Sequence, residues 1–160
     1  MLSAFQDHIS NRFPFLKDSK LIVAISGGLD SVALTHMLHH SQMEFALAHC
    51  NFNLRGEESD EDEAFVQSLA NDLDIEVFTQ HFDTLTFAKE HNMSIQMAAR
   101  ELRYEWFNDL ANQLGYDVIL TAHHLNDNLE TFLINLSRGT GLKGLTGIPE
   151  QNGNIARPLL

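Results

Sequence analysis

The sequence predicts an α/β domain in which helices cover both faces of a doubly wound parallel sheet. Short runs of apolar and β-branched residues alternate along the chain with longer segments whose apolar residues recur every three or four positions. A turn with two adjacent glycines joins the first such run to the helix-like segment after it. The 160 residues, of which 44% are hydrophobic, are enough for one domain with a buried core. In this architecture the functional site lies at the carboxyl ends of the strands.

Helices and strands alternate regularly through the first half of the chain. A short amphipathic helix is predicted at residues 2–11, and the apolar run at residues 20–25 is the first predicted strand. A helix at residues 31–40 and a strand at residues 45–49 follow. The next helix is predicted to begin at the capping-box pattern of Ser59 and Asp62, where acids are frequent, and to end at Leu73.

The second half repeats this alternation. Strands are predicted at residues 76–80 and 118–121, and helices at residues 84–91, 94–114 and 126–137. The long helix carries an apolar stripe that is predicted to be buried, formed by Ile95, Ala98, Ala99, Leu102, Trp106 and Leu110. The last helix is predicted to bury a second apolar face, formed by Leu129, Phe132, Leu133 and Leu136.

Composition limits the partners and the compartment of this chain. A formal net charge of −12 argues against this domain alone holding a nucleic acid, since counterion release needs many Lys and Arg side chains. The sequence has no bilayer-spanning run and no secretory signal, and its lone Cys50 permits no intrachain disulfide. We therefore expect a cytoplasmic protein that does not bind a membrane. The sequence does not determine the oligomeric state, and a homodimer is compatible with it. The apolar end Arg-Pro-Leu-Leu indicates a domain cut from a longer protein.

The turn SGGLDS at residues 26–31 is predicted to bind the phosphates of a nucleotide. Two glycines let the backbone approach a phosphate closely, and the helix that follows offers free N–H groups and a positive dipole. The loop contains no lysine, which excludes a Walker A site, and the acid Asp30 indicates that Mg²⁺ lies between it and the phosphates. The predicted nucleotide-binding residues are Ala24, Ser26, Gly27, Gly28, Leu29, Asp30 and Ser31. The alternative is a plain glycine turn.

Two histidines and two acids follow the fourth predicted strand, in the segment TAHHLNDNLET. Asp127 and Glu130 are three residues apart and therefore share one helix face, turned to solvent or to the active-site crevice. The alternative is that they are ordinary first-turn acids favoured by the helix dipole. A zinc site at His123 and His124 is disfavoured, because adjacent strand residues face opposite ways and the H-E-x-x-H spacing is absent.

Polar and basic side chains stand near these segments. Asn51 and Arg55, after the second strand, are candidates for contacting a base edge or a phosphate, and the alternative is a solvated loop. Arg100 and Arg103 share one face of the long helix, where the alternative is a surface ion pair with a neighbouring glutamate. The glycine-rich stretch at residues 138–149 is predicted to be a mobile loop that closes over substrate.

Six segments together carry a resemblance to a known family. SGGLDS, HCNFNLRGEES, AARELRY, TAHHLNDNLET, LSRGTGLKGLTGIP and ARPLL occur in the same order as in the tRNA(Ile)-lysidine synthetase family, and the chain resembles its N-terminal catalytic domain over about residues 20–160. SGGLDS resembles the PP-loop of the N-type ATP pyrophosphatase superfamily. The resemblance implies a Rossmann-like adenine nucleotide α-hydrolase fold over residues 1–160, with tRNA-binding domains downstream.

The resemblance also implies a reaction. Members of the family use ATP to attach L-lysine to C2 of the first anticodon cytidine of an isoleucine tRNA with a CAU anticodon. An adenylated cytidine is the intermediate, and lysidine, AMP and pyrophosphate are the products. The implied catalytic residues are Asp30, Arg100, Arg103, His123, Asp127 and Glu130. The implied substrate contacts are Asn51, Arg55, Glu130, Arg138 and Lys143.

Individual roles follow from the same resemblance. Asn126 stands where the family often has the first of two acids, which leaves Asp30 and Asp127 as the implied Mg²⁺ ligands. Glu130 is implied to bind lysine, and His123 or Asp127 to accept its proton. Two alternatives stay open. One is another PP-loop tRNA-modifying enzyme, although thiolation of the iron–sulfur type needs clustered cysteines. The other is a nucleotide-binding module without catalysis, which would not need these arginines and acids.

Overall fold

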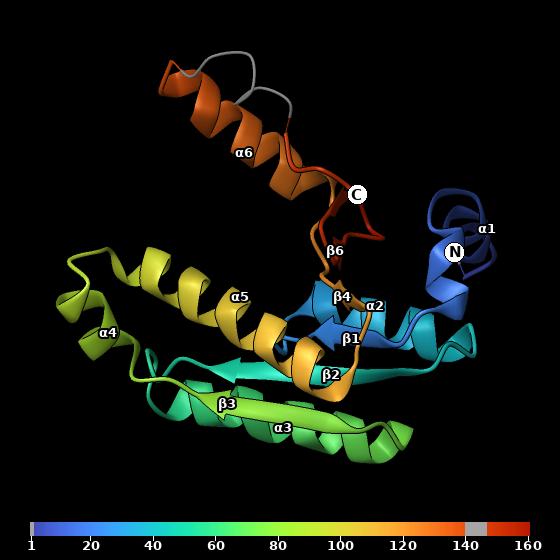
Figure 1. Ribbon diagram of the computed structural model, residues 1–160, viewed down its shortest axis with the longest axis horizontal. Helices are drawn as coiled ribbons and strands as arrows, with labels where there is room; N and C mark the ends of the chain where they lie inside the picture. Colours follow the sequence, from blue (N-terminus) through green and yellow to red (C-terminus); the bar gives the residue numbers. More distant parts are fainter. Residues whose placement is uncertain (1, 140–146) are drawn as a thin grey trace.

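A six-stranded sheet forms the centre of the molecule in the computed structural model, which describes residues 2–139 and 147–160 (Figure 1). The strands are β1 (Leu21–Ala24), β2 (Phe45–Asn51), β3 (Val77–His81), β4 (Val118–Leu120), β5 (Gln151–Asn152) and β6 (Ile155–Ala156). Their order across the sheet is β3-β2-β1-β4-β6-β5. Neighbouring strands are parallel except β5 and β6, which form an antiparallel hairpin. The four predicted strands are confirmed.

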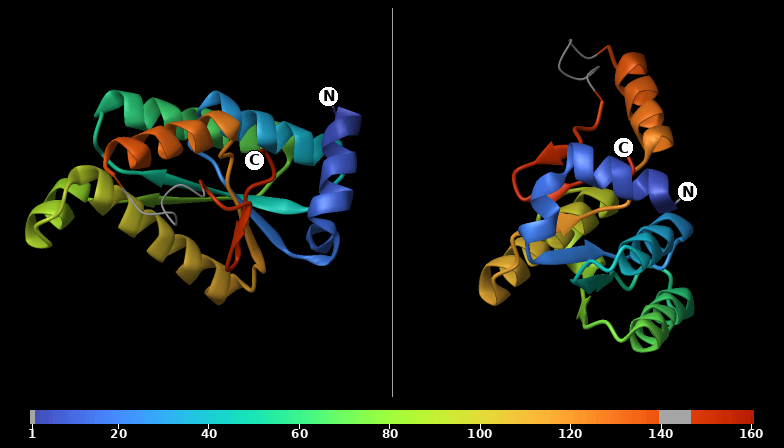
Figure 2. Two further views of the ribbon diagram at one scale, coloured as in Figure 1. Left: turned by 90° about the horizontal axis from the view of Figure 1, so that it is seen from above. Right: turned by 90° about the vertical axis from the view of Figure 1, so that its right-hand side faces the viewer.

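Helices cover both faces of the sheet, which confirms the doubly wound prediction. The described helices are α1 (Leu2–Arg12), the 3-10 helix η1 (Pro14–Asp18), α2 (Leu29–His40), α3 (Glu57–Leu73), α4 (Thr84–Glu90), α5 (Ile95–Leu114) and α6 (Leu125–Ser137). Figure 2 shows α2 and α3 on one face and α5 on the other. Because successive strand residues face opposite ways, Val23 packs into the core with α2 and α3, whereas Ile22 packs with α5. None of the described helices is long and apolar enough to cross a bilayer.

The order in which the chain adds strands to the sheet reverses at β1. From β1 it passes through α2 to β2 on one side, and from β3 it returns through α4 and α5 to β4 on the other side. Val23 pairs with Leu47 of β2 and with Leu120 of β4, so the carboxyl ends of these three strands lie close together. The crevice at such a switch point is the usual ligand site of open α/β sheets.

Three short elements near the ends of the chain were not predicted from the sequence. These are η1 and the β5–β6 hairpin, whose strands have two residues each and are too short to show a periodic pattern. A turn with Gly153 at φ +59° joins β5 to β6. Through the pairing of β6 with β4, the C-terminal segment enters the core, and Arg157 is only 5% exposed.

The predicted N-cap of α3, Ser59, is wrong by three residues. The helix begins at Glu57 and its N-cap is Gly56, which has a φ of +54°. Ser59 is therefore inside the helix, and its Oγ accepts a hydrogen bond from the Arg55 N–H at 3.2 Å instead of capping the helix. Acidic residues still crowd the first turn, where the helix dipole stabilises them.

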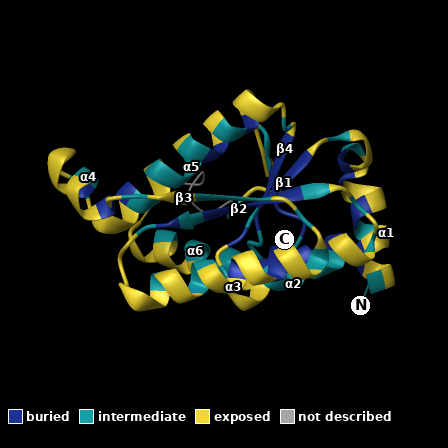
Figure 3. Ribbon diagram, turned by 90° about the horizontal axis from the view of Figure 1, so that it is seen from below, coloured by how far each residue is buried: buried dark blue, intermediate teal, exposed yellow. Residues whose placement is uncertain are grey.

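The predicted buried face of α6 is also wrong. Leu129, Leu133 and Leu136 are 56%, 52% and 53% exposed, and no residue of α6 is buried in the part of the chain that the structure describes. The helix projects beyond the sheet (Figure 1), and in Figure 3 it carries the colours of exposed and intermediate residues. Amphipathic periodicity predicts which face avoids water, but not that another element covers it. For the same reason Ile95, in the first turn of α5, is 44% exposed.

Candidate active site

The phosphate loop, residues 26–31, connects β1 to α2. The helix begins at Leu29, two residues earlier than predicted, so the second half of the loop is its first turn. Ser31 Oγ accepts from the Ser26 N–H at 3.2 Å and donates to the Gly28 carbonyl at 2.9 Å, which closes the loop on itself. Within residues 2–139 and 147–160 no side chain caps α2. Its first N–H groups are therefore available to an anion, as the sequence predicts.

Gly27 has a φ of +91°, a conformation that L-residues with a side chain rarely adopt. A Cβ at this position would lie 3.6 Å from Asp62 of α3. Gly27→Ala is therefore expected to lower the free energy of unfolding by about 1–2 kcal/mol and to weaken ATP binding by displacing the loop. Equilibrium urea unfolding and calorimetric titration with ATP measure the two effects.

Gly115→Ala is the matched control for this substitution. Gly115 also has a positive φ, +69°, but has no neighbour within 4 Å of an added Cβ and lies at the end of α5. We expect a similar loss of stability with unchanged affinity for ATP. Unchanged ATP affinity in Gly27→Ala would show that the loop does not bind the nucleotide.

A buried histidine that the sequence did not reveal supports the phosphate loop. His49 of β2 is 3% exposed, and its Nδ1 lies 2.9 Å from the carbonyl oxygen of Ile25, the residue just before the loop. A carbonyl oxygen only accepts, so Nδ1 carries the proton and donates. The hydrogen bond crosses between neighbouring strands, and this is why no local sequence pattern predicts it.

A cleft of about 270 Å³ opens at the carboxyl ends of the strands, beside the phosphate loop. Hereafter we call it the carboxyl-end cleft. Eight predicted site residues line it: Ala24, Ser26, Gly28, Asp30, Ser31, Arg103, His123 and Asp127. The aromatic side chains of Phe52, Tyr104 and Phe107 line it as well, and they were not predicted. A larger cavity of about 890 Å³ lies where β1 and β2 begin, and no predicted site residue lines it.

One imidazole connects the two predicted metal ligands in this cleft. His124 Nε2 lies 3.3 Å from Asp30 Oδ2, and His124 Nδ1 lies 3.6 Å from Asp127 Oδ2. The side chain of Asp127 also accepts a hydrogen bond from the His124 N–H at 2.8 Å, which caps α6. The sequence therefore identified the two acids but assigned no role to the histidine between them.

The fit of a divalent cation can be judged from this donor set. Among the described residues, no group of three or more His, Cys, Asp or Glu side chains is arranged to hold a metal ion. Two carboxylates near a phosphate loop instead suit Mg²⁺, which usually takes one or two protein carboxylates together with substrate phosphates. Asp30 and Asp127 thus fit a cation that is shared with a nucleotide.

His123 lines the carboxyl-end cleft and is partly buried. Its Nδ1 is 2.9 Å from Thr121 Oγ1. Partial burial lowers the pKa of His123, nearby Arg157 lowers it further, and Asp127 opposes the shift. The imidazole is therefore unprotonated at neutral pH and able to accept a proton.

The lowered pKa of His123 predicts a dependence of stability on pH. Below about pH 6.5, the ordinary histidine value, the unfolded chain binds the proton more readily than the folded chain. The contribution of His123 to stability is therefore fully present above that pH and is lost as the pH falls. We expect the free energy of unfolding of His123→Gln, measured with urea between pH 5 and 8, to fall less on acidification than that of wild type. Identical pH profiles would contradict the shift.

The two predicted arginines occupy different positions. Arg103 lines the carboxyl-end cleft, and its guanidinium lies 5.2 Å from the centre of the Phe52 ring. Arg100 is exposed and lies over the ring of Tyr104 at 4.9 Å. Neither forms an ion pair with a described carboxylate, so the alternative of a surface pair with a neighbouring glutamate is not supported.

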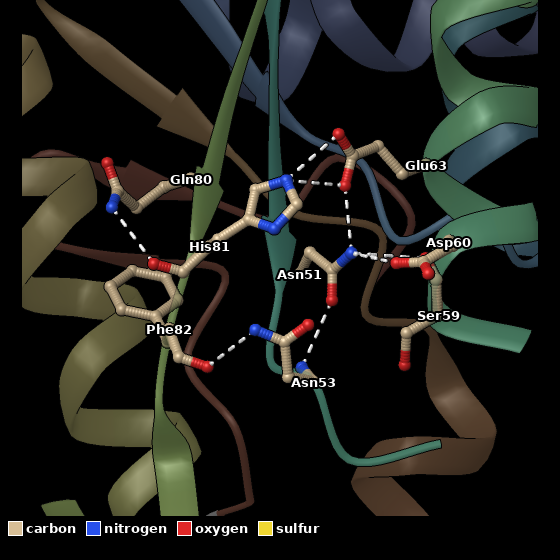
Figure 4. A network of polar contacts seen from close by, with 8 residues as sticks. All are labelled: Asn51, Asn53, Ser59, Asp60, Glu63, Gln80, His81 and Phe82. Carbon is tan, nitrogen blue, oxygen red and sulfur yellow. Dashed lines mark hydrogen bonds and ion pairs between the residues drawn. The ribbon is translucent and has the colours of Figure 1, made fainter. Parts of the chain in front are cut away.

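Asn51 does not line the cleft and belongs instead to a polar network that joins β2 to α3 (Figure 4). It is 1% exposed and its Nδ2 donates to Glu63 Oε2 at 2.8 Å and to Asp60 Oδ1 at 3.2 Å. His81 contacts the same glutamate at 2.9 Å. Partial burial raises the pKa of Glu63, but the hydrogen bonds from Asn51 and His81 outweigh it, so the pKa is lowered. The amide of Asn51 fixes the loop after β2 to α3.

Three further predicted substrate contacts, Arg55, Glu130 and Arg138, do not line the carboxyl-end cleft. Arg55 is exposed and pairs with Glu58 at 3.8 Å. Glu130 and Arg138 are exposed on α6 and at its end. Lys143 and most of the predicted closing loop lie outside the described residues.

Cys50 lines the carboxyl-end cleft as an unreactive group. Burial raises the pKa of its thiol to about 12, although nearby Arg103 opposes the shift. The thiol is therefore protonated at neutral pH and is a poor nucleophile.

Known proteins resemble this chain in sequence and in fold. It is 51% identical over 153 residues to the tRNA(Ile)-lysidine synthase of Bacteroides thetaiotaomicron, covering 96% of the chain and 36% of that protein. It is 53% identical over 144 residues to the tRNA(Ile)-lysidine synthase of Porphyromonas gingivalis, covering 89% and 32%. The chain thus spans about a third of the length of these curated relatives.

A solved structure and a family profile complete the comparison. The fold matches the U34-tRNA thiolase NcsA from Methanococcus maripaludis with a TM-score of 0.76 and 19% identity, over 98% of this chain and 57% of that one. At that identity the likeness concerns the fold. The profile of the family described as the PP-loop domain matches residues 1–160. With this match over the whole chain, and with the phosphate loop at the switch point of its sheet, the chain belongs to the PP-loop domain family.

Proposed function

We propose that this chain is the catalytic domain of a tRNA(Ile)-lysidine synthetase, acting in the cytoplasm. In this reaction ATP drives the attachment of L-lysine to C2 of the first anticodon cytidine of an isoleucine tRNA with a CAU anticodon. The observation that carries the proposal is the gathering of the phosphate loop, Arg103, His123 and Asp127 around one cleft. Relatives of that name, at 51% and 53% identity, support it.

In the first step, cytidine O2 attacks the α-phosphorus of ATP and pyrophosphate leaves. The N–H groups in the first turn of α2 donate hydrogen bonds to the phosphates, and Arg103 stabilises the charge that develops at the α-phosphate. The adenine base packs on the aromatic side chains of Phe52 and Tyr104 in the carboxyl-end cleft. Adenylation turns O2 into part of a good leaving group.

Asp30 and Asp127 are the residues that would hold Mg²⁺ at this site. When bound, the ion neutralises phosphate charge and polarises the phosphoryl oxygens. The two carboxylates come from different segments, Asp30 from the phosphate loop and Asp127 from the first turn of α6. A nucleotide with its cation therefore connects two parts of the chain that are distant in sequence.

In the second step, the lone pair of the lysine ε-amine forms the bond to C2. The C2–O2 bond breaks, and its electrons leave with AMP, which keeps that oxygen. The ε-ammonium has a pKa of ~10.4 in water and must first lose a proton. His123 suits this task because it is unprotonated at neutral pH and lines the cleft, and Asp127 is the second candidate.

The substrates need contacts beyond the cleft. We assign the lysine ammonium to Glu130, one helical turn after Asp127, and tRNA phosphates to Arg55, Arg100, Arg138 and Lys143. Most of the tRNA would be held by domains downstream of residue 160. The net charge of −12 supports this division, because it repels RNA phosphates over much of the surface.

The test follows lysine into RNA. The protein is incubated with ATP, Mg²⁺, labelled lysine and a transcript of isoleucine tRNA with a CAU anticodon. A transcript with a UAU anticodon, which lacks the first-position cytidine, is the control. Label in the CAU transcript alone is the expected result, and absence of label from both transcripts would contradict the proposed function.

A further inference from the structure

We infer that His124 is a positioning residue whose imidazole orients the carboxylate of Asp30 toward the metal–nucleotide complex. This inference rests on the proposed function, because it assumes that the phosphate loop binds ATP with a divalent cation. Two observations carry it. One is that the two ring nitrogens face different partners, the N–H of Asn126 and the carboxylate of Asp30. The other is that a helix cap alone does not require a histidine.

The protonation of His124 follows from its neighbours. Its Nδ1 lies 3.2 Å from the backbone N–H of Asn126. A backbone N–H can only donate, so Nδ1 is the acceptor and the proton of the neutral imidazole is on Nε2. Nε2 and its proton lie beside the Asp30 carboxylate, with 3.3 Å between Nε2 and Oδ2. The opposite tautomer would place two donors against each other and a lone pair against a carboxylate.

These contacts engage one carboxylate oxygen of Asp30 and one of Asp127, and leave the other oxygen of each available to a ligand. The side chain of Asp30 is 55% exposed, and His124 is its only polar side-chain partner in the described part of the chain. Asp127 Oδ2 is similarly occupied by the backbone N–H of His124 at 2.8 Å. In each acid the contact engages Oδ2 and leaves Oδ1 for a ligand. The imidazole of His124 therefore sets the direction from which Asp30 meets a cation, whereas Asp127 is held by a backbone N–H that any residue at position 124 supplies.

Capping alone does not account for a histidine at this position. The preferred N-cap residues are Ser, Thr, Asp and Asn, whose short side chains accept from the first turn. His124 does cap α6, but its ring also reaches the phosphate loop with the second nitrogen. Partners of metal ligands in such a position typically contribute a factor of about 10–100 to metal affinity or activity.

The test separates capping from positioning by substitution. His124→Asn keeps an excellent N-cap but is too short to reach Asp30, whereas His124→Gln is longer and keeps an amide donor. We expect His124→Asn to unfold at the wild-type urea concentration, yet to bind Mn²⁺ in the presence of ATP about 10–100-fold more weakly, as measured by electron paramagnetic resonance. His124→Gln should recover part of the affinity. His39→Asn, an exposed histidine at the other end of α2, is the matched control.

Activity gives an independent readout. The Mg²⁺ concentration for half-maximal lysidine formation should rise by the same factor, while the rate at saturating Mg²⁺ recovers. Wild-type Mn²⁺ affinity in His124→Asn, or no Mn²⁺·ATP binding by wild type, would overturn the inference. If His124→Asn weakens Mn²⁺ binding but wild type forms no lysidine, the inference stands and the proposed function fails.

Discussion

Asp30→Asn is expected to lower the rate of lysidine formation by about 100–1,000-fold, the size of effect found when one electrostatic contact to a transition state is removed. The substitution keeps the shape of the side chain and removes the charge that faces the metal–nucleotide complex. Because the Asp30 side chain is 55% exposed and packs in no core, the fold should be unaffected. Single-turnover lysine transfer gives the rate, and circular dichroism checks the fold.

Asp72→Asn is the matched control for this experiment. Asp72 is an exposed aspartate on α3, away from the carboxyl-end cleft, and its substitution changes the net charge by the same amount. The rate of lysidine formation by Asp72→Asn should equal that of the wild-type protein. Equal rates for Asp30→Asn and Asp72→Asn would show that the charge of Asp30 has no role in the reaction.

Arg103→Ala is expected to have the second largest effect, again about 100–1,000-fold in rate. Arg103 is the basic residue among those lining the carboxyl-end cleft that the structure describes. Arg103→Lys should recover only part of the loss, because an ammonium keeps the charge but not the planar contact with the Phe52 ring. The rate of AMP formation with saturating tRNA is the measurement.

Two comparisons make this result specific. Arg12→Ala breaks a surface pair with Glu150 far from the cleft and should leave the rate unchanged. Arg100→Ala should lower the rate of AMP formation less than Arg103→Ala does, because Arg100 is exposed and does not line the cleft. A larger loss for Arg100→Ala would reverse the assignment of the two arginines.

The sequence predicted the parts of this protein that local patterns determine. Residues 26–31 were recognisable because glycines, an acid and two serines follow a β-branched run, and the structure places that loop at the switch point of the sheet. The carboxyl ends of β1 and β4 then bring Asp30 close to His123 and Asp127. Parallel strand order alone is enough to predict this meeting.

Features that depend on tertiary contacts were not predictable. His49 forms a hydrogen bond with Ile25, just before the phosphate loop, and His124 contacts Asp30 of that loop. Both histidines belong to other parts of the chain, and no sequence spacing indicates these contacts. Asn51 looked like a substrate contact because it follows a strand, yet its amide turns into the network with Glu63. The exposed Leu129 on α6 has the periodicity of a core residue without a described element to cover it.

The most direct test of the central claim is to identify the products of ATP. The protein is incubated with ATP labelled at the α-phosphate, Mg²⁺ and isoleucine tRNA with a CAU anticodon, with and without lysine. We predict labelled AMP only when both the tRNA and lysine are present, and label retained on the tRNA as adenylated cytidine when lysine is left out. Cytidine O2 is the nucleophile at the α-phosphorus, and AMP leaves only when lysine attacks C2. Formation of ADP, or of AMP at the same rate without tRNA, would contradict this prediction.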